Sequence, residues 1–266
     1  MLRIGLSAPS ENRQAVEACD RAARWLTAHG AAVVRERDFA NQPMDALVAM
    51  GGDGTMLRCA KTAASLDVPM LGVNMGHMGF LTEVEADDLE EALDRLLSGE
   101  YAEEARVMLC VTWGDRRFLA LNDVVLTRGA YPRLIRVQAQ VDGGWAGDYR
   151  ADGLLVATPT GSTGYSLSAG GPIIAPAVDC MLITPICPHS LQHRPQVVAG
   201  DARVTLSLST AESIRASLQI DGQHCAELRE GDSVSVRKAE TRVRLVRIRP
   251  DGFFDVVHQK LIEWSR

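Results

Sequence analysis

Apolar residues in the first hundred positions alternate between short runs and a helical spacing. Residues 2–6, 31–34, 46–50 and 70–73 form short apolar runs, which are typical of buried strands. Residues 11–29 carry apolar side chains at helical spacing and end at Gly30, and shorter helices are predicted over about 55–66 and 89–97. Strands that alternate with helices predict a doubly wound, Rossmann-like parallel sheet.

After residue 101 the pattern changes to short β-like runs separated by turns. The runs cover residues 107–112, 117–127, 134–141, 154–158, 202–208, 214–220, 233–236 and 243–248. Such spacing is typical of an all-β, sandwich-like unit. Residues 253–264 are predicted to form a helix that packs back on the first domain. We therefore expect an α/β domain over 1–100, joined by about 250–266, and an all-β domain over 101–249.

Composition narrows the class of protein. Of the 266 residues, 46% are hydrophobic and 23% are charged, as in ordinary globular proteins. No apolar run approaches the roughly 18 residues of a membrane span, and the N-terminus lacks the apolar region of a secretory signal, so we expect a cytoplasmic protein. The net charge of −6 argues against nucleic acid or an anionic membrane as a partner.

Cysteine, histidine and lysine offer few candidates for chemistry. The six cysteines and six histidines are scattered, with no CxxC or HExxH spacing, so we predict reduced thiols and no structural zinc. The lysines are Lys61, Lys238 and Lys260, and no Walker A sequence is present.

The strongest local motif is the run from Gly51 to Thr55, GGDGT, between an apolar strand and a helix. Glycines at this edge of an α/β sheet let the backbone approach a phosphate, which the helix N-terminus attracts. An acid in such a loop repels phosphate unless it holds a metal or takes a proton from the attacking group, which makes Asp53 informative. The alternative is a plain turn in which Asp53 caps the helix.

Three further segments carry polar residues beside apolar strands. The segment 74–83, NMGHMGFLTE, either contacts a ligand or supports the first loop. Asn122 and Asp123 interrupt an apolar strand and need either internal hydrogen bonds or a ligand. The segment 149–172 runs from a buried strand into a loop rich in glycine and hydroxyl side chains, with Tyr165 as an aromatic face suited to a nucleotide. Its GSTG run fails the spacing of a serine-hydrolase elbow by one residue.

Taken in order, GGDGT, NxGxxGFLTE, LND and DGLLVATPTGSTGYSLSAGGPI resemble the NAD kinase family, over about residues 51 to 223. The resemblance also covers residues 183–191 and the run from Asp221 to Gln223. The GGDGT loop is shared with diacylglycerol kinases, sphingosine kinases and phosphofructokinases, whereas the TPTGST stretch separates NAD kinases from them.

The resemblance implies a phosphotransferase that transfers phosphate from ATP or polyphosphate to the 2′-hydroxyl of the adenosine ribose of NAD, giving NADP. On this basis we expect Asp53 to be the general base, Gly51, Gly52, Gly54 and Thr55 to cradle the donor phosphates, and Mg²⁺ to arrive with ATP. A homodimer or homotetramer is also implied. The implied NAD-binding residues are Asp53, Gly54, Arg58, Asn122, Asp123, Arg133, Arg150, Asp152, Thr163, Gly164, Tyr165, Ser166, Leu167, Ser168 and Gln223.

Two alternative functions remain open at this point. A lipid kinase would share the GGDGT loop, but the chain has no polybasic cluster for docking on a membrane. A non-catalytic dinucleotide sensor would share the fold but have no need of Asp53. A 6-phosphofructokinase is disfavoured because the second half of the chain is all-β rather than α/β.

Overall fold

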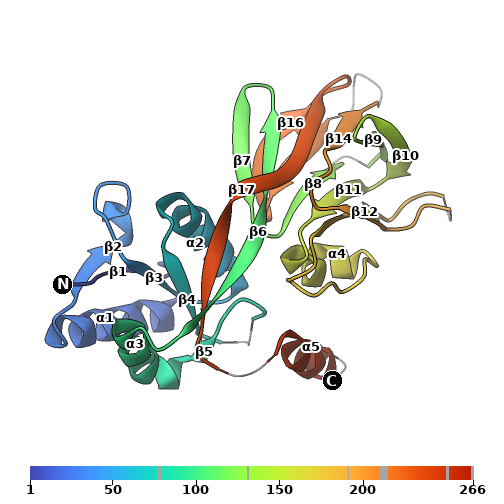
Figure 1. Ribbon diagram of the computed structural model, residues 1–266. Helices are drawn as coiled ribbons and strands as arrows, with labels where there is room; N and C mark the ends of the chain where they lie inside the picture. Colours follow the sequence, from blue (N-terminus) through green and yellow to red (C-terminus); the bar gives the residue numbers. More distant parts are fainter. Residues whose placement is uncertain (77–78, 131, 191, 210–214, 250–251, 265–266) are drawn as a thin grey trace. The chain divides into compact units, whose positions relative to one another are not determined.

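The computed structural model describes residues 1–76, 79–130, 132–190, 192–209, 215–249 and 252–264. Positions 77–78, 191, 214, 250–251 and 265–266 of the segments discussed above lie outside these ranges. The chain forms two compact units, one of Met1–Arg106 with Thr241–Arg266 and the other of Val107–Glu240 (Figure 1). Two strands, β6 (Ala102–Trp113) and β17 (Ser233–Arg247), begin in one unit and end in the other.

The first unit is built on a parallel sheet with the strand order β17-β4-β3-β1-β2, to which β5 adds a short pairing with β4. Its strands are β1 (Arg3–Ser7), β2 (Ala32–Arg35), β3 (Ala46–Met50), β4 (Pro69–Asn74) and β5 (Val84–Glu85). Its helices are α1 (Arg13–Ala28), α2 (Asp53–Leu66), α3 (Leu89–Ser98) and α5 (Phe253–Trp264), with short 3₁₀ turns η1 (Glu36–Asp38) and η2 (Ala86–Asp88).

Helices cover both faces of this sheet, because its central strands carry apolar side chains on both faces. Val48 and Met50 share one core with Leu26 of α1 and with α3. On the neighbouring β4, a Cβ at Gly72 would lie 2.7 Å from the Met56 side chain of α2. Successive strand residues point to opposite faces, so β3 and β4 are buried on both sides. The predicted α/β fold is confirmed.

The second unit is a sandwich of antiparallel strands. One layer has the order β10-β9-β14-β17, with β6 and β7 beside it, and the other has the order β13-β12-β11-β8-β15-β16. Buried residues of both layers, among them Val137 and Leu206 from one and Val124 and Val156 from the other, form one core. The strands in addition to β6 and β17 are β7 (Arg116–Ala120), β8 (Asp123–Thr127), β9 (Ile135–Val141), β10 (Gly144–Ala151), β11 (Gly153–Ala157), β12 (Cys180–Ile186), β13 (Gln196–Ala199), β14 (Val204–Leu208), β15 (Ala216–Ile220) and β16 (Gln223–Leu228).

Several sequence-predicted elements differ from the observed ones. The single strand expected over 117–127 is two strands, β7 and β8, with a turn at Leu121 and Asn122. The two strands expected over 233–236 and 243–248 are one, because the polar residues between them lie on an exposed stretch of β17 that stays extended. The strands β10, β12, β13 and β16 were not predicted, nor were the short helices η3 (Thr160–Thr163) and α4 (Tyr165–Ser168).

The predicted C-terminal helix has the bounds of α5, and its residues belong to the first unit. No helix in the described part of the chain combines the length and the apolar character needed to cross a membrane.

Candidate active site

The GGDGT loop follows β3 and turns directly into α2. The helix begins at Asp53, two residues earlier than the sequence pattern predicts. Gly51 donates its N–H to Val73 O at 2.9 Å, which ties the loop to β4. A Cβ at Gly51 would lie 2.3 Å from Thr55 Oγ1, whereas one at Gly52 or Gly54 would meet nothing within 4 Å. Gly51 is therefore required by packing, and the backbone at Gly52 and Gly54 has open space beside it.

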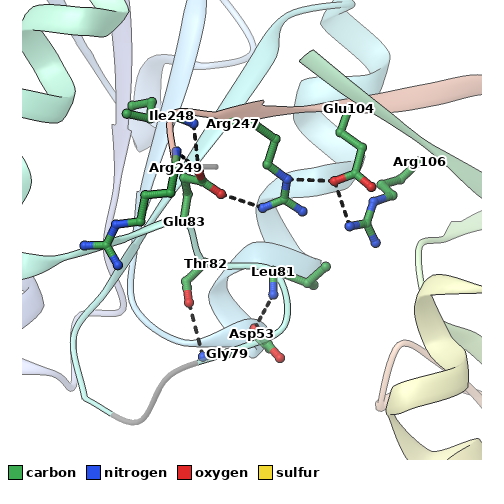
Figure 2. A network of polar contacts seen from close by, with 10 residues as sticks. All are labelled: Asp53, Gly79, Leu81, Thr82, Glu83, Glu104, Arg106, Arg247, Ile248 and Arg249. Atoms are coloured by element: carbon green, nitrogen blue, oxygen red, sulfur yellow. Dashed lines mark hydrogen bonds and ion pairs between the residues drawn. The ribbon is translucent and has the colours of Figure 1, made fainter. Parts of the chain in front are cut away.

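The carboxylate of Asp53 is held by the backbone of the second loop. Its two oxygens accept the N–H groups of Phe80 at 2.9 Å and Leu81 at 3.0 Å. A Cβ at Gly79 would lie 1.9 Å from Asp53 Oδ1, so only glycine permits this close approach. Residues 79–81 therefore support the first loop, as one of the two interpretations of residues 74–83 predicts (Figure 2).

Arg58, one turn into α2, is engaged within its own unit. Its guanidinium forms an ion pair with Glu36 and donates to Ser7 Oγ at 3.1 Å. Ser7 Oγ in turn donates to the other carboxylate oxygen of Glu36 at 2.7 Å. Because the Arg58 side chain is 37% exposed, a phosphate would compete with Glu36 for a partly solvated guanidinium.

In the second unit the turn between β7 and β8 is organised by Asp221. Its carboxylate accepts three consecutive backbone N–H groups, from Leu121 at 3.0 Å, Asn122 at 2.8 Å and Asp123 at 3.2 Å. Asp221 adopts a left-handed conformation, with φ of 48°, which aspartate tolerates better than most residues. Sequence reasoning missed this role, although the Asp221-Gly222 turn was a visible signal.

The TPTGST loop packs on the same turn. Thr158 donates its N–H to Asn122 O at 2.9 Å and its hydroxyl to Leu121 O at 2.6 Å. A Cβ at Gly161 would lie 2.1 Å from Asn122 O, so this glycine permits direct contact between the two backbones. Three predicted motifs, LND, TPTGST and the Asp221 turn, thus meet at one end of the sheet that contains β8, β11 and β15.

One polar atom in this cluster lacks a partner. Asn122 Oδ1 is buried and accepts no hydrogen bond from the described residues. Leaving a buried acceptor unpaired costs about 1–3 kcal/mol, so such an atom is a feature to explain. The backbone of the Asn122–Asp123 pair is satisfied internally, while this side-chain oxygen is left available.

The carboxylates of the cluster influence one another. Burial, and then the charge of Asp221, raise the pKa of Asp123 from 3.8 to about 7. Burial, followed by nearby Cys187, Asp152 and Asp123, raises the pKa of the Tyr165 phenol. Asp152 forms an ion pair with Arg128, with Arg128 Nε 2.5 Å from its carboxylate.

The remaining predicted binding residues divide into buried and exposed positions. Ser166 is fully buried, with its hydroxyl 2.9 Å from Thr184 Oγ1, and Thr163 donates to Thr160 O at 3.1 Å. Tyr165 is 44% exposed. The other exposed members are Arg133, Arg150, Ser168 and Gln223, while Gly164 and Leu167 are half-buried. Within the ranges described, no group of three or more His, Cys, Asp or Glu side chains is placed to hold a metal ion.

The fold and these loops define a class of protein: an α/β unit with a glycine-rich loop at the edge of its parallel sheet, combined with a β-sandwich unit. Solved structures share this architecture. The chain superimposes with a TM-score of 0.84 on yeast NADH kinase complexed with NADH, at 24% identity, covering 98% of this chain and 87% of that one. It superimposes with a TM-score of 0.77 on an NAD kinase from Archaeoglobus fulgidus in complex with ATP, at 26% identity, covering 97% and 98%.

Sequence comparison identifies the family. Residues 9–101 match the model of the ATP-NAD kinase N-terminal domain, and residues 121–248 match that of the C-terminal domain. The NAD kinase of Geotalea daltonii is 40% identical over 284 aligned positions, covering 100% of this chain and 99% of that protein. The NAD kinase of Moorella thermoacetica is 45% identical over 223 positions, covering 82% and 71%. The chain belongs to the NAD kinase family, which confirms the prediction from its motifs over the lipid kinase and the non-catalytic sensor.

Proposed function

We propose that Asp53 is the general base of this kinase and accepts the proton of the ribose 2′-hydroxyl of NAD. The observation that supports this role is that the Asp53 carboxylate accepts hydrogen bonds from the N–H groups of Phe80 and Leu81. A carboxylate has about four lone-pair sites, so two N–H donors orient it and leave sites to accept a proton. Because the carboxylate is already oriented, less entropy is lost when the reactive geometry forms, which lowers the free-energy barrier.

In the proposed step, the 2′-oxygen of the ribose attacks the γ-phosphorus of ATP. A new P–O bond forms, the bond to the β-phosphate oxygen breaks, and ADP leaves with the electron pair. The hydroxyl proton passes to Asp53. The products are NADP and ADP.

We assign the donor phosphates to the backbone of the GGDGT loop. Gly52 and Gly54 have open space beside their Cα atoms, which allows a bulky anion to approach. The N-terminus of α2 adds a favourable dipole for negative charge. We propose that a divalent cation such as Mg²⁺ arrives with ATP, where it would neutralise negative charge on the donor phosphates.

We assign recognition of NAD to the cluster in the second unit. The unpaired Asn122 Oδ1 is an acceptor suited to a hydroxyl or amine of the dinucleotide. The carboxylates of Asp123 and Asp152 and the half-exposed ring of Tyr165 offer hydrogen bonds and an aromatic surface. Arg133, Arg150, Ser168 and Gln223 are accessible to a ligand. A homo-oligomeric, cytoplasmic protein remains a prediction.

The test is NADP formation from NAD, ATP and Mg²⁺ by the wild type and by Asp53→Asn. Loss of base catalysis should lower kcat by about 100- to 10,000-fold while NAD binding, measured by calorimetry, persists. Asp87→Asn is the control, because Asp87 is an exposed acid at the start of the 3₁₀ turn η2. Near-normal turnover by Asp53→Asn would refute the assignment. Replacing ATP by polyphosphate in the same assay reports donor choice.

A further inference from the structure

The loop of residues 79–83 has two sides with different partners. On one side the N–H groups of Phe80 and Leu81 hold the Asp53 carboxylate. On the other side Glu83 contacts the end of β17 (Figure 2). The loop therefore lies between Asp53 and the C-terminal part of the first unit.

Glu83 is the main anchor on that second side. One carboxylate oxygen accepts the N–H groups of Ile248 and Arg249, each at 2.7 Å. The other oxygen accepts from Arg247 Nη1 at 2.8 Å. The Glu83 backbone also donates to Gly72 O at 2.9 Å, and its side chain is only 7% exposed. Three charge-assisted hydrogen bonds to a buried carboxylate fix the position of this end of the loop.

Arg247 is itself held from two directions. Its Nε donates to Glu104 at 2.7 Å, and Glu104 also accepts from Arg106 at 2.9 Å. Burial alone would lower the pKa of Arg247, but Glu104 and Glu83 raise it above its ordinary value. Burial alone would raise the pKa of Glu104, but Arg106 and then Arg247 hold it below its usual range. Arg247 and the two glutamates therefore stabilise one another's charges, whereas burial, and to a smaller extent the charge of Arg247, lower the pKa of Arg106.

Thr82 closes the loop from within. Its hydroxyl accepts the N–H of Gly79 at 3.2 Å, immediately before the two residues that bond Asp53. The hydrogen bond between Thr82 and Gly79 therefore encloses the two donor residues, Phe80 and Leu81, and Thr82 is directly followed by Glu83.

We propose that Glu83, supported by Arg247 and assisted by Thr82, is a positioning residue for Asp53. Glu83 does not touch the carboxylate of Asp53; it fixes the backbone that presents Phe80 N–H and Leu81 N–H to it. The proposal rests on the proposed function of Asp53. It predicts that weakening this anchor lowers the rate of the chemical step more than the affinity for NAD.

The primary experiment compares Glu83→Gln and Glu83→Ala in the full-length chain. Glu83→Gln keeps an oxygen for Ile248 and Arg249 but loses the charge that pairs with Arg247, so its effect should be the smaller. Glu83→Ala removes all three bonds, and kcat should fall by about 10- to 100-fold because reactive geometry is sensitive to small displacements. The dissociation constant of NAD should stay within about twofold, since ground-state binding uses other residues. Each kcat is calculated from the maximal rate and the concentration of protein that binds NAD, so that misfolded protein is excluded.

A second pair of variants keeps the test decisive if Glu83→Ala folds poorly. Thr82→Val matches the shape of threonine but removes the acceptor of Gly79 N–H, and kcat should fall by about tenfold. Thr82→Ser retains the hydroxyl and should restore kcat. Glu103→Gln is the control: it removes a carboxylate that pairs with Arg244 at 2.9 Å between β6 and β17, the two strands that the Glu104–Arg247 pair also joins, and kcat should be unchanged.

The outcomes separate the two proposals. Near-normal kcat in both Glu83→Ala and Thr82→Val, with Asp53→Asn inactive, would overturn the positioning role alone. A loss of NAD affinity equal to the loss of turnover, or an equal loss in Glu103→Gln, would also overturn it. Near-normal turnover in Asp53→Asn would instead refute the function proposed for Asp53.

Discussion

Asp123 makes the stability of the second unit depend on pH. Asp123 is 5% exposed and lies at the start of β8, where its backbone N–H donates to the Asp221 carboxylate. Asp152 is also near, since Asp152 and Asp123 both raise the pKa of Tyr165. Burial, and then the charge of Asp221, raise the pKa of the Asp123 carboxyl from 3.8 to about 7. In the unfolded chain the same group ionises near its ordinary value. The perturbation that isolates this effect is Asp123→Asn, which removes the ionisation and keeps the shape.

The size of the effect follows from the shift. Each pKa unit corresponds to about 1.4 kcal/mol, so a rise from 3.8 to about 7 amounts to about 4 kcal/mol. Between these pH values the folded state binds a proton that the unfolded state has lost, so the contribution of Asp123 to stability falls as pH rises. The contribution of Asp123 to stability does not change with pH below about pH 4. Above about pH 7 it is again constant, and the folded state is then less stable by the full amount of about 4 kcal/mol.

The assay is urea unfolding of the wild type and Asp123→Asn, without NAD, at several pH values from 4.5 to 8. The variant should gain about 3 kcal/mol in free energy of unfolding relative to the wild type as pH rises across this window, because part of the total effect already lies below pH 4.5. Asp115→Asn makes the same substitution in an exposed turn and should show no such trend. A difference between wild type and Asp123→Asn that is independent of pH would refute the reasoning.

Two further predictions test close contacts in the two units. Gly79→Ala places a Cβ 1.9 Å from Asp53 Oδ1, so the loop must shift; kcat should fall at least about tenfold in the NADP assay, and normal kcat would contradict the contact. Gly76→Ala, whose Cβ meets nothing within 4 Å, should keep the melting temperature in a thermal scan. Asp221→Ala leaves three backbone N–H groups without their acceptor and should cost about 3 kcal/mol in urea unfolding. Asp221→Asn should cost less, because it keeps an oxygen and tolerates a left-handed backbone, so equal losses would count against the cap.

The regular elements of the first unit could be predicted from local pattern. The predicted bounds of the strand 46–50 and of the helix 253–264 match the observed ones. In the strand the apolar run, and in the helix the helical spacing, agrees with the flanking residues about where the element begins and ends. Where local pattern and tertiary pairing disagree, the prediction was wrong. The pattern predicts two strands, over 233–236 and 243–248, but strand pairing and the buried residues on either side keep the polar residues between them extended in β17. The single strand over 117–127 was wrong because Asp221, about 100 positions later, stabilises a turn inside it.

For the candidate site, the sequence identified the loops but not all of their contacts. Asp53, Asn122 and Asp123 were selected because an acid among phosphate-binding glycines and a polar pair in an apolar strand both need a physical reason. That Phe80 and Leu81 hold Asp53 through their N–H groups has no side-chain signature, because every residue except proline offers the same donor. The roles of Glu83 and Arg247 depend on pairing between segments more than 160 positions apart.

The sequence alone determined the family, the α/β-then-β order of the chain and the residue types available for chemistry, because motif spacing and apolar period are local properties. Only the tertiary structure decided which backbone groups meet which carboxylates. Hydrogen bonds and burial act at distances of a few ångströms between residues far apart in the chain. It is the folded chain that places Asp53 against the loop of residues 79–83 and Asp221 against the turn at Asn122.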